Sequence, residues 1–292
     1  MNKHAYLIMA HGSWDELVHT ISLIDDPRND IYIHIDAKCT NFPEDSIIKA
    51  AEYSSIYFTD RISVSWGGFS EIQCEMILFK TAAQTAYYSY YHLLSGVDTP
   101  VKSQDYIHNY FNQHQGLNFI NYQEHDKEFS HSQLELRYRQ YHFLQDRFIG
   151  KKRNFAKYVD FASCYIQRLV GIKRSKGRIF RKSWQWVSLT DECVRFLLSR
   201  EEDIQKTYRF TYCCDEVFII SEIWNTPLQE TIAPQGNLRF AEWKQFSKHD
   251  TSPRAIDMGD LHRLESPDIL FARKYIIPDS VAVMQRLEQI WQ

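Results

Sequence analysis

The sequence predicts a single domain of the α/β class, in which a mostly parallel sheet carries helices on both faces. Its 292 residues are close to the largest size that one hydrophobic core supports. Hydrophobic residues make up 44% and charged residues 24%, which is typical of a globular chain and excludes a disordered or fibrous one. Along the first third, short apolar runs alternate with helical periodicities, and such alternation produces right-handed crossovers between parallel strands. We therefore expect one domain over residues 1–292.

The first strand and helix are predicted within residues 5–24. Residues 5–10 (AYLIMA) form a continuous apolar run, typical of a strand that is buried on both faces. After His11 and one glycine, Ser13 and Glu16 have the spacing of a capping box, in which each side chain satisfies the other's helix-end amide. Apolar residues then recur with helical spacing to about residue 24.

The later elements continue this alternation. Ser70 and the three residues after it form a second capping-box pattern, which opens a helix through about residue 86. Further strands are predicted at 30–36, 56–58, 90–94, 117–120 (an edge strand) and 186–189, and further helices at 44–52, at 190–199 and from about 215.

Charge is unevenly distributed along the chain. Residues 137–182 contain 14 Lys and Arg against two Asp, a net charge of +12, so that the other 246 residues carry −15. Aromatic and aliphatic residues within this segment are spaced roughly as one helix face. The pattern fits a basic helix lying on an anionic membrane surface, a solvated basic helix beside an acidic domain, or a nucleic-acid patch. Because no nucleic-acid motif accompanies it, we expect no nucleic-acid partner.

Cysteine usage and the N-terminal pattern predict a cytoplasmic protein, with peripheral contact at the inner face of the membrane. No signal-peptide pattern opens the sequence, and no apolar run reaches the ~20 residues of a membrane span. The six cysteines form no CxxC pair and are expected to be reduced, buried thiols: Cys39, Cys74, Cys164, Cys193, Cys213 and Cys214.

Two candidate ligand residues follow the first two strands, at the sheet edge where ligands bind in such folds. His11 comes directly after the first strand, and Asp36 ends the second, a position at which an acidic residue commonly holds a ribose or base donor group. Alternatively, His11 is an ordinary loop histidine and Asp36 a helix cap. Only one glycine accompanies His11, which argues against a dinucleotide-binding turn.

Charged residues in the second half are further candidates. Asp215 and Glu216 lead into an apolar run, either as ordinary first-turn acids or with one of them serving as a general base. Lys274 lies in a strand-like run 20 residues after Arg254, and the two cations either hold a diphosphate or form surface salt bridges. The chain contains no Asp-x-Asp, HExxH, Walker or clustered Cys/His pattern, so no metal or cofactor is predicted.

Taken together, the sequence resembles the core-2/I-branching β-1,6-N-acetylglucosaminyltransferase family, which also contains the peptide O-xylosyltransferases. The resemblance spans nearly the whole chain and rests on the shared order of eight short stretches: 5–11 (AYLIMAH), 34–38 (HIDAK), 65–68 (SWGG), 93–100 (LLSGVDTP), 184–190 (WQWVSLT), 214–217 (CDEV), 259–261 (GDL) and 270–275 (LFARKY). Animal relatives carry a membrane anchor and disulfides. Because this sequence shows the pattern of neither, the resemblance points to a bacterial-type member.

The resemblance implies a GT-A-like, Rossmann-type fold and an inverting, metal-independent transfer from a UDP-sugar. His11 and Asp36 would border the uridine, and Glu216, with Asp215 beside it, would deprotonate the acceptor hydroxyl. Lys274 would bind the diphosphate, and Arg254 would assist, although its spacing to Lys274 is shorter than the family pattern.

The leading hypothesis is an N-acetylglucosaminyltransferase that acts in surface polysaccharide synthesis, with UDP-N-acetylglucosamine as donor. Transfer of xylose or another UDP-sugar, and a non-catalytic nucleotide-sugar or membrane-binding module, are the alternatives. Residues 121–182 do not match the family's motifs, which leaves the acceptor open. The basic aromatic segment favours a glycan, or a lipid-linked glycan, at an anionic membrane surface.

Overall fold

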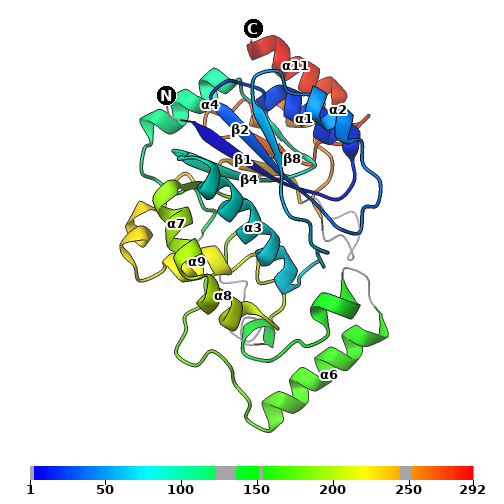
Figure 1. The fold of residues 1–292 in the computed structure, drawn as a ribbon, viewed down its shortest axis with the longest axis vertical. Helices are drawn as coiled ribbons and strands as arrows, with labels where there is room; N and C mark the ends of the chain where they lie inside the picture. The colour runs from blue at the N-terminus through cyan, green and yellow to red at the C-terminus, as the bar shows by residue number, and fades with distance from the viewer. Residues whose placement is uncertain (1–2, 123–135, 151–153, 244–251, 292) are drawn as a thin grey trace.

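The computed structural model describes residues 3–122, 136–150, 154–243 and 252–291, which build two sheets (Figure 1). The larger sheet has the order β3-β2-β1-β4-β6 and the smaller one β5-β8-β7. Their bounds are β1 His4–Ala10, β2 Asn29–Ile35, β3 Ser55–Phe58, β4 Tyr90–Ser95, β5 Asp98–Pro100, β6 Ser188–Thr190, β7 Arg239–Ala241 and β8 Phe271–Arg273.

Strand β1 lies at the centre of the larger sheet. It pairs in parallel with β2 on one side and with β4 on the other, so that Leu7 stands between Tyr32 and Leu93. β3 extends the parallel pairing, and only β6, at the far edge, runs antiparallel. The predicted α/β class with a mostly parallel sheet is thus confirmed.

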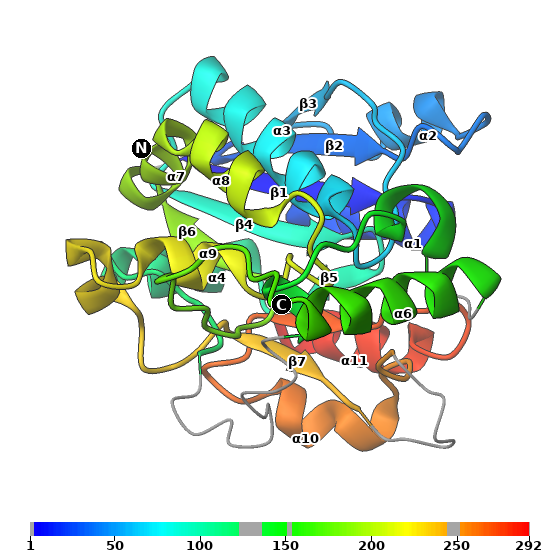
Figure 2. The same cartoon turned by 90° about the horizontal axis from the view of Figure 1, so that it is seen from below.

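Helices cover both faces of this sheet, as predicted (Figure 2). Alternate residues of β1 point to opposite faces, with Leu7 in the core beneath α3 and α7, and Tyr6 and Ile8 in the core beneath α1 and α4. A third core joins the smaller sheet to α10 and α11. The helix bounds are α1 Trp14–Ile24, α2 Glu44–Lys49, α3 Phe69–Thr85, α4 Gln104–Gln113, α6 Phe155–Leu169, α7 Asp191–Ser199, α8 Glu201–Tyr208, α9 Phe218–Ile223, α10 Leu261–Leu264 and α11 Val281–Trp291, with single turns η1 Gln145–Ile149, η2 Pro227–Thr231 and η3 Met258–Asp260.

The first predicted capping box does not form. Ser13 has a positive φ of 53° and its side chain makes no cap hydrogen bond. Glu16 instead accepts a hydrogen bond at Oε1 from the Ile277 backbone N–H, at 3.0 Å. A tertiary contact therefore replaces the local one, and it ties α1 to the C-terminal part of the chain.

The second capping box is also replaced by tertiary contacts. α3 begins at Phe69, and Ser70 donates from its backbone N–H and from Oγ to Asp146 of η1, at 3.0 and 2.9 Å. A Cβ on Gly68 would lie 2.1 Å from the same Asp146 oxygen, so a larger residue at this position would displace the carboxylate from Ser70. The basic segment thus helps to fix the start of α3, together with the local contact in which Glu71 accepts the Gly67 backbone N–H at 2.8 Å.

Three predicted element bounds are corrected. The expected edge strand at 117–120 is reduced to isolated bridges at Asn118 and Phe119. The strand expected at 186–189 is limited to β6, and the helix expected from about 215 begins at Phe218, which leaves Asp215 in the preceding turn. All six cysteines are free thiols; five of them are buried, as predicted, and Cys39 is partly exposed. Among the described residues, no helix is long and apolar enough to cross a membrane.

A buried arginine joins the two sheets. Arg239 of β7 donates from Nη2 to the backbone carbonyls of Val187 and Leu93, at 2.6 and 3.2 Å, and to Ser188 Oγ at 3.2 Å. Its guanidinium also lies over the ring of Phe271, 5.0 Å from the centroid. Arg239 therefore links the smaller sheet, to which it belongs, to the edge of the larger sheet.

We predict that Arg239→Met lowers the free energy of unfolding by about 2–4 kcal/mol, because it leaves buried acceptors without their donor. Urea unfolding measures the change. Arg195→Met is the matched control, since the Arg195 side chain is half exposed and its partner Asp191 keeps a hydrogen bond from Tyr91, and it should cost less than about 1 kcal/mol. Equal losses in the two variants would contradict the assignment.

Candidate active site

A cleft of about 990 Å³ opens where β1, β2 and β4 end and where β8 leaves the smaller sheet. Five of the six residues predicted from the sequence line this cleft: His11, Asp36, Asp215, Glu216 and Lys274. They come from four separate segments of the chain, which the parallel sheet and β8 bring to one place. The sixth, Arg254, is outside the lining, although its neighbours Ser252 and Pro253 are part of it.

The ends of β1 and β2 hold His11 and Asp36. The Asp36 backbone N–H donates to the Ala10 carbonyl at 2.9 Å, which continues the parallel ladder to the last residue of β1. One Asp36 carboxylate oxygen accepts the Lys38 backbone N–H at 2.9 Å, and the other lies 3.3 Å from Lys38 Nζ. Asp36 is buried and fixed by these contacts, whereas His11 is exposed on the cleft wall.

The turn before α9 carries Asp215 and Glu216. Cys213, with a positive φ of 50°, donates its backbone N–H to the Gly67 carbonyl at 2.8 Å, and this contact sets the turn against the start of α3. Ser183 fixes the other side, since its N–H donates to the Glu216 carbonyl at 2.7 Å. Both carboxyl groups are thereby placed at the cleft.

Several carboxyl groups converge behind this turn. Burial, followed by the nearby charge of Glu216, raises the pKa of Asp215 to about 7. Burial and then the charge of Asp215 raise the pKa of Glu71 on α3 well above its ordinary value, and burial does the same for Glu75 one turn later. Glu71 also accepts the Gly67 backbone N–H at 2.8 Å. These groups hold protons at pH values at which an ordinary carboxyl is ionised.

Glu216 is more open to the cleft than Asp215, with 36% of its side chain exposed. Two cations of the basic segment face its carboxylate: Arg137 Nη1 lies 3.7 Å and Lys182 Nζ 3.8 Å from Oε2. Neither distance is that of a hydrogen bond. The carboxylate thus has cationic neighbours and an oxygen in position to accept a proton from a bound hydroxyl.

Two adjacent cations stand at the end of β8. Lys274 was predicted from the sequence, and Arg273 beside it also lines the cleft. Arg273 stacks on the Trp186 ring, 4.4 Å from the centroid, and its Nε lies 3.3 Å from an Asp98 oxygen. A pair of cations in the lining of a cleft suits a phosphate-bearing ligand.

Arg254 is engaged elsewhere. Its guanidinium donates to Asp260 at 2.7 Å and to Asp257 at 3.0 Å, within η3 and the turn before it. Its backbone approaches Lys274, whose N–H donates to the Arg254 carbonyl at 3.3 Å. The two acids follow Arg254 by three and six residues, a local signal that the guanidinium has partners of its own.

Sequence reasoning did not single out the tryptophans of the cleft. Trp66, Trp184, Trp186 and Trp243 all contribute to its lining. Trp184 and Trp243 meet edge to face with centroids 6.3 Å apart. Three of the four tryptophans lie in stretches that carry the family resemblance, Trp66 in 65–68 and both Trp184 and Trp186 in 184–190, whereas Trp243 has no such signal. Flat aromatic walls of this kind suit the apolar face of a sugar or base.

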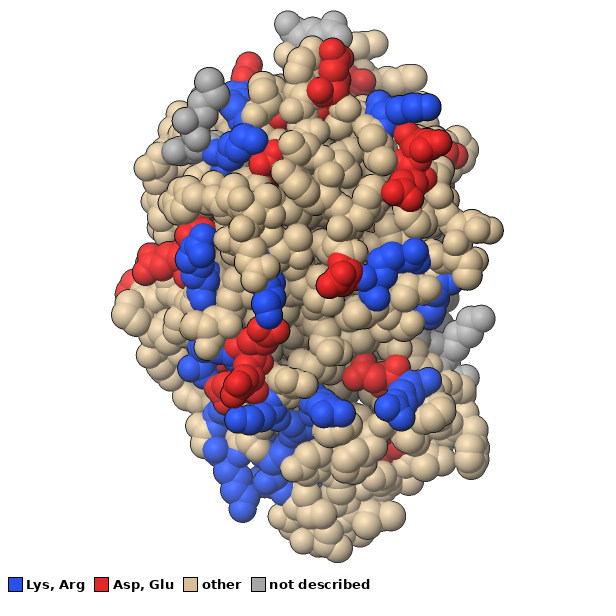
Figure 3. Space-filling view, in the orientation of Figure 1, with Lys and Arg blue, Asp and Glu red and all other residues tan. Residues whose placement is uncertain are grey.

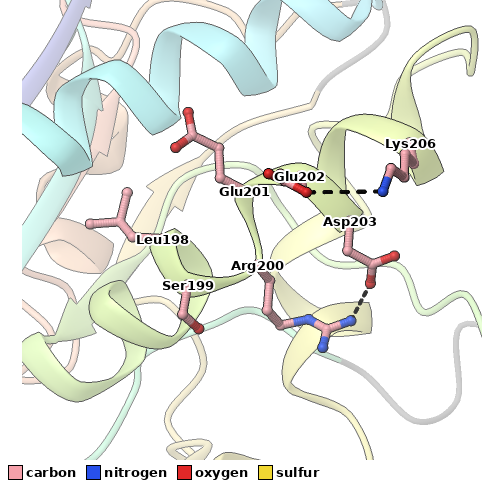
Figure 4. Close-up of a pocket in the computed structure, with 7 residues that line it drawn as sticks. All are labelled: Leu198, Ser199, Arg200, Glu201, Glu202, Asp203 and Lys206. Atoms are coloured by element: carbon pink, nitrogen blue, oxygen red, sulfur yellow. Dashed lines mark hydrogen bonds and ion pairs between the residues drawn. The ribbon is translucent and has the colours of Figure 1, made fainter.

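Two other features are separate from the cleft. A hollow of about 480 Å³ lies between α7 and α8 (Figure 4), where Arg200 pairs with Asp203, and Lys206 with Glu202 at 4.0 Å. Within the part of the chain that the structure describes, one group of residues has the proximity of metal ligands: His142, Asp160 and Cys164. It is buried beneath α6, and none of its members lines the cleft.

The fold and the cleft define an α/β protein with a ligand site at the carboxyl ends of its strands, built from carboxylates, cations and tryptophans. Residues 4–265 match the model of the Core-2/I-Branching enzyme family, and the chain belongs to this family. It is therefore a glycosyltransferase with a GT-A-like fold.

Comparison with individual proteins adds little detail. No curated protein sequence matches the chain. A crystal structure of mouse xyloside xylosyltransferase 1, in its apo form, is similar with a TM-score of 0.40 and 10% identity, over 93% of this chain and 97% of that one.

We predict that Asp215→Asn flattens the dependence of stability on pH. The folded state holds the Asp215 proton more tightly than the unfolded chain, so the stability it supplies is present below the ordinary carboxyl pKa and is lost as pH rises through about 7. Urea unfolding at a series of pH values between about 5 and 8 should show the wild type losing about 1–3 kcal/mol more than the variant. Parallel curves would show that Asp215 does not titrate in this range.

Proposed function

We propose that the protein transfers a sugar, N-acetylglucosamine in the first instance, from a UDP-sugar to a glycan hydroxyl with inversion and without a metal ion. The observation that carries this proposal is the convergence of His11, Asp36, Glu216 and Lys274 on one cleft. The family's activity gives the reaction class, and the side chains in the cleft supply the groups that such a reaction requires.

Glu216 is the proposed general base. Inversion at the sugar carbon proceeds by one displacement, so the acceptor hydroxyl attacks while one carboxylate removes its proton. Glu216 is the more exposed of the two acids in the turn before α9, and its Oε2 makes no hydrogen bond with the cations 3.7 and 3.8 Å away. Asp215 also lines the cleft but is buried, so Glu216 is the better placed of the two to meet an acceptor.

Lys274 is the proposed partner of the leaving UDP. As the bond to the sugar breaks, negative charge develops on the diphosphate, and a fixed cation stabilises that charge. Arg273, held against Trp186, adds a second positive charge at the same end of β8. His11 and Asp36 would border the uridine at the ends of β1 and β2.

The donor sugar and the biological role are the finer parts of the proposal. The tryptophan walls accept any pyranose, so xylose or another UDP-sugar is the alternative to N-acetylglucosamine, and a donor panel separates them. A module that binds nucleotide sugars without turnover is the second alternative. We place the enzyme in surface polysaccharide synthesis on the cytoplasmic side of the membrane, with the free thiols and the basic segment in support.

We predict that Glu216→Gln lowers turnover roughly 10²–10⁴-fold while UDP affinity changes little, because the amide removes the base and leaves the nucleotide site intact. Single-turnover transfer to a glycan acceptor and titration with UDP measure the two effects. Glu230→Gln, an exposed site outside the cleft, is the matched control. Near-normal turnover in the Glu216 variant would remove this residue as the base.

We predict that UDP binds in excess EDTA and that Lys274→Ala weakens this binding by about 1.5–3 kcal/mol, the scale of a hydrogen bond to a charged group. Calorimetric titration measures both. Lys80→Ala, on α3 in an exposed pair with Glu201, is the matched control. Binding that appears only after manganese is added would sink the metal-free mechanism, and unchanged affinity in the Lys274 variant would exclude the diphosphate contact.

A further inference from the structure

Helix α6 directs polar side chains toward the protein and apolar side chains toward the outside, which is the reverse of an ordinary surface helix. The face that packs on the protein is polar and carries Asp160, Cys164 and Gln167, all buried. The opposite face is apolar and exposed, with Phe155 82% and Leu169 70% accessible and Tyr158 between them. A helix that only has to cover a core shows the reverse arrangement, with its apolar side inward. The exposed stripe therefore needs a partner outside the described fold.

Specific contacts hold α6 in this orientation. Asp160 accepts a hydrogen bond from His142 Nδ1 at 2.6 Å, and although burial opposes it, this contact raises the pKa of His142 to about 9. Gln167 both accepts from and donates to the Tyr141 backbone, at 2.8 and 2.9 Å. Because these partners satisfy the buried groups, the helix cannot rotate to hide its apolar face without breaking them.

The apolar surface extends beyond α6 and is bordered by cations. Large apolar side chains of the same segment are exposed on either side of the helix, among them Phe143, Phe148, Val170 and Ile172. Exposed basic side chains accompany them, including Arg147, Arg168 and Lys176. The two acids of the segment point inward, since Asp146 accepts from Ser70 and Asp160 from His142. The surface thus combines apolar and positive groups.

We infer that this surface, defined as α6 with its exposed apolar and basic neighbours in 137–182, lies in the headgroup layer of an anionic membrane. An interfacial helix of this kind inserts its apolar side and binds acidic headgroups through flanking Lys and Arg. The segment carries +12 in sequence while the rest of the chain carries −15. Arg174 is buried and Arg178 is paired with Asp203 and Glu222, so the exposed cations of the segment are the ones that attract an anionic surface. The same charge opposes a second copy as partner, because two segments of +12 would face each other.

The position of the surface gives it a role in substrate selection. Figure 1 places α6 at one end of the molecule, and the space-filling view shows that end as mostly uncharged, with basic side chains gathered beside it (Figure 3). Three residues of the same segment reach the cleft: Gly150 and Lys182 line it, and Arg137 faces Glu216. Docking would set the cleft near the lipid headgroups, which points to a lipid-linked acceptor. The inference of a lipid-linked acceptor rests on the proposed function, whereas the inference of a contact with lipid does not.

Co-sedimentation with vesicles tests the contact directly. The full chain is mixed with vesicles of phosphatidylcholine alone, or with about 30% phosphatidylglycerol, and we expect at least about tenfold tighter binding to the anionic vesicles. The combined substitutions Phe155→Ser, Tyr158→Ser and Leu169→Ser should lower that binding by about tenfold or more. Replacing Tyr53, Tyr87 and Ile290, which are exposed outside the segment, by serine is the matched control.

A second variant, which removes positive charges, tests the attraction to acidic headgroups separately from the insertion of apolar side chains. Arg147→Gln, Arg168→Gln and Lys176→Gln should remove most of the preference for anionic vesicles, at roughly fivefold per charge. Equal binding to neutral and anionic vesicles, or undiminished binding of the serine variant, overturns the inference. So does sedimentation equilibrium showing a dimer that the serine substitutions dissociate. Because UDP binding is measured separately, a failure of the lipid contact is distinct from a failure of the proposed function.

Discussion

The parallel pairing of β1 with β2 and β4 is the constraint on which the rest of the structure depends. It buries β1 on both faces, and it places the carboxyl ends of three strands at one edge of the sheet. The hydrogen bond from the Asp36 N–H to Ala10 continues this pairing to the point where the strands end. Every other part of the cleft is arranged around that edge: the turn before α9, the end of β8 and the tryptophans.

The distribution of charge in the cleft depends on how far each carboxyl group is buried. The carboxyl groups of Asp215, Glu71 and Glu75 are removed from water and hold their protons more tightly, so the wall behind the turn carries less negative charge than its sequence suggests. Glu216 stands in front of that wall, beside Arg137 and Lys182. Less negative charge behind the turn makes the cleft better suited to a negatively charged donor.

Patterns with local causes were predictable from the sequence, and those with tertiary causes were not. The apolar run of β1 specifies a buried strand because both faces of the strand need apolar side chains. The capping boxes failed because the Ile277 N–H and the Asp146 carboxylate, both far along the chain, engage Glu16 and Ser70. Five of the six predicted site residues line one cleft, since each follows a strand or lies in a motif. Trp66, Trp184 and Trp186 also lie in quoted motifs, but no charge or strand end marks them as ligand contacts, and Trp243 lies in no motif.

The contact between Gly68 and Asp146 has a consequence for engineering. The SWGG stretch and the basic segment are distant in sequence, yet a side chain on Gly68 would collide with the carboxylate that helps to fix the start of α3. The residue at position 68 and the residue at position 146 are therefore structurally coupled. A chimera that exchanges residues 137–182 for the corresponding segment of another family member keeps the contact with Ser70 when the donor supplies an acid equivalent to Asp146 and the host keeps its glycine.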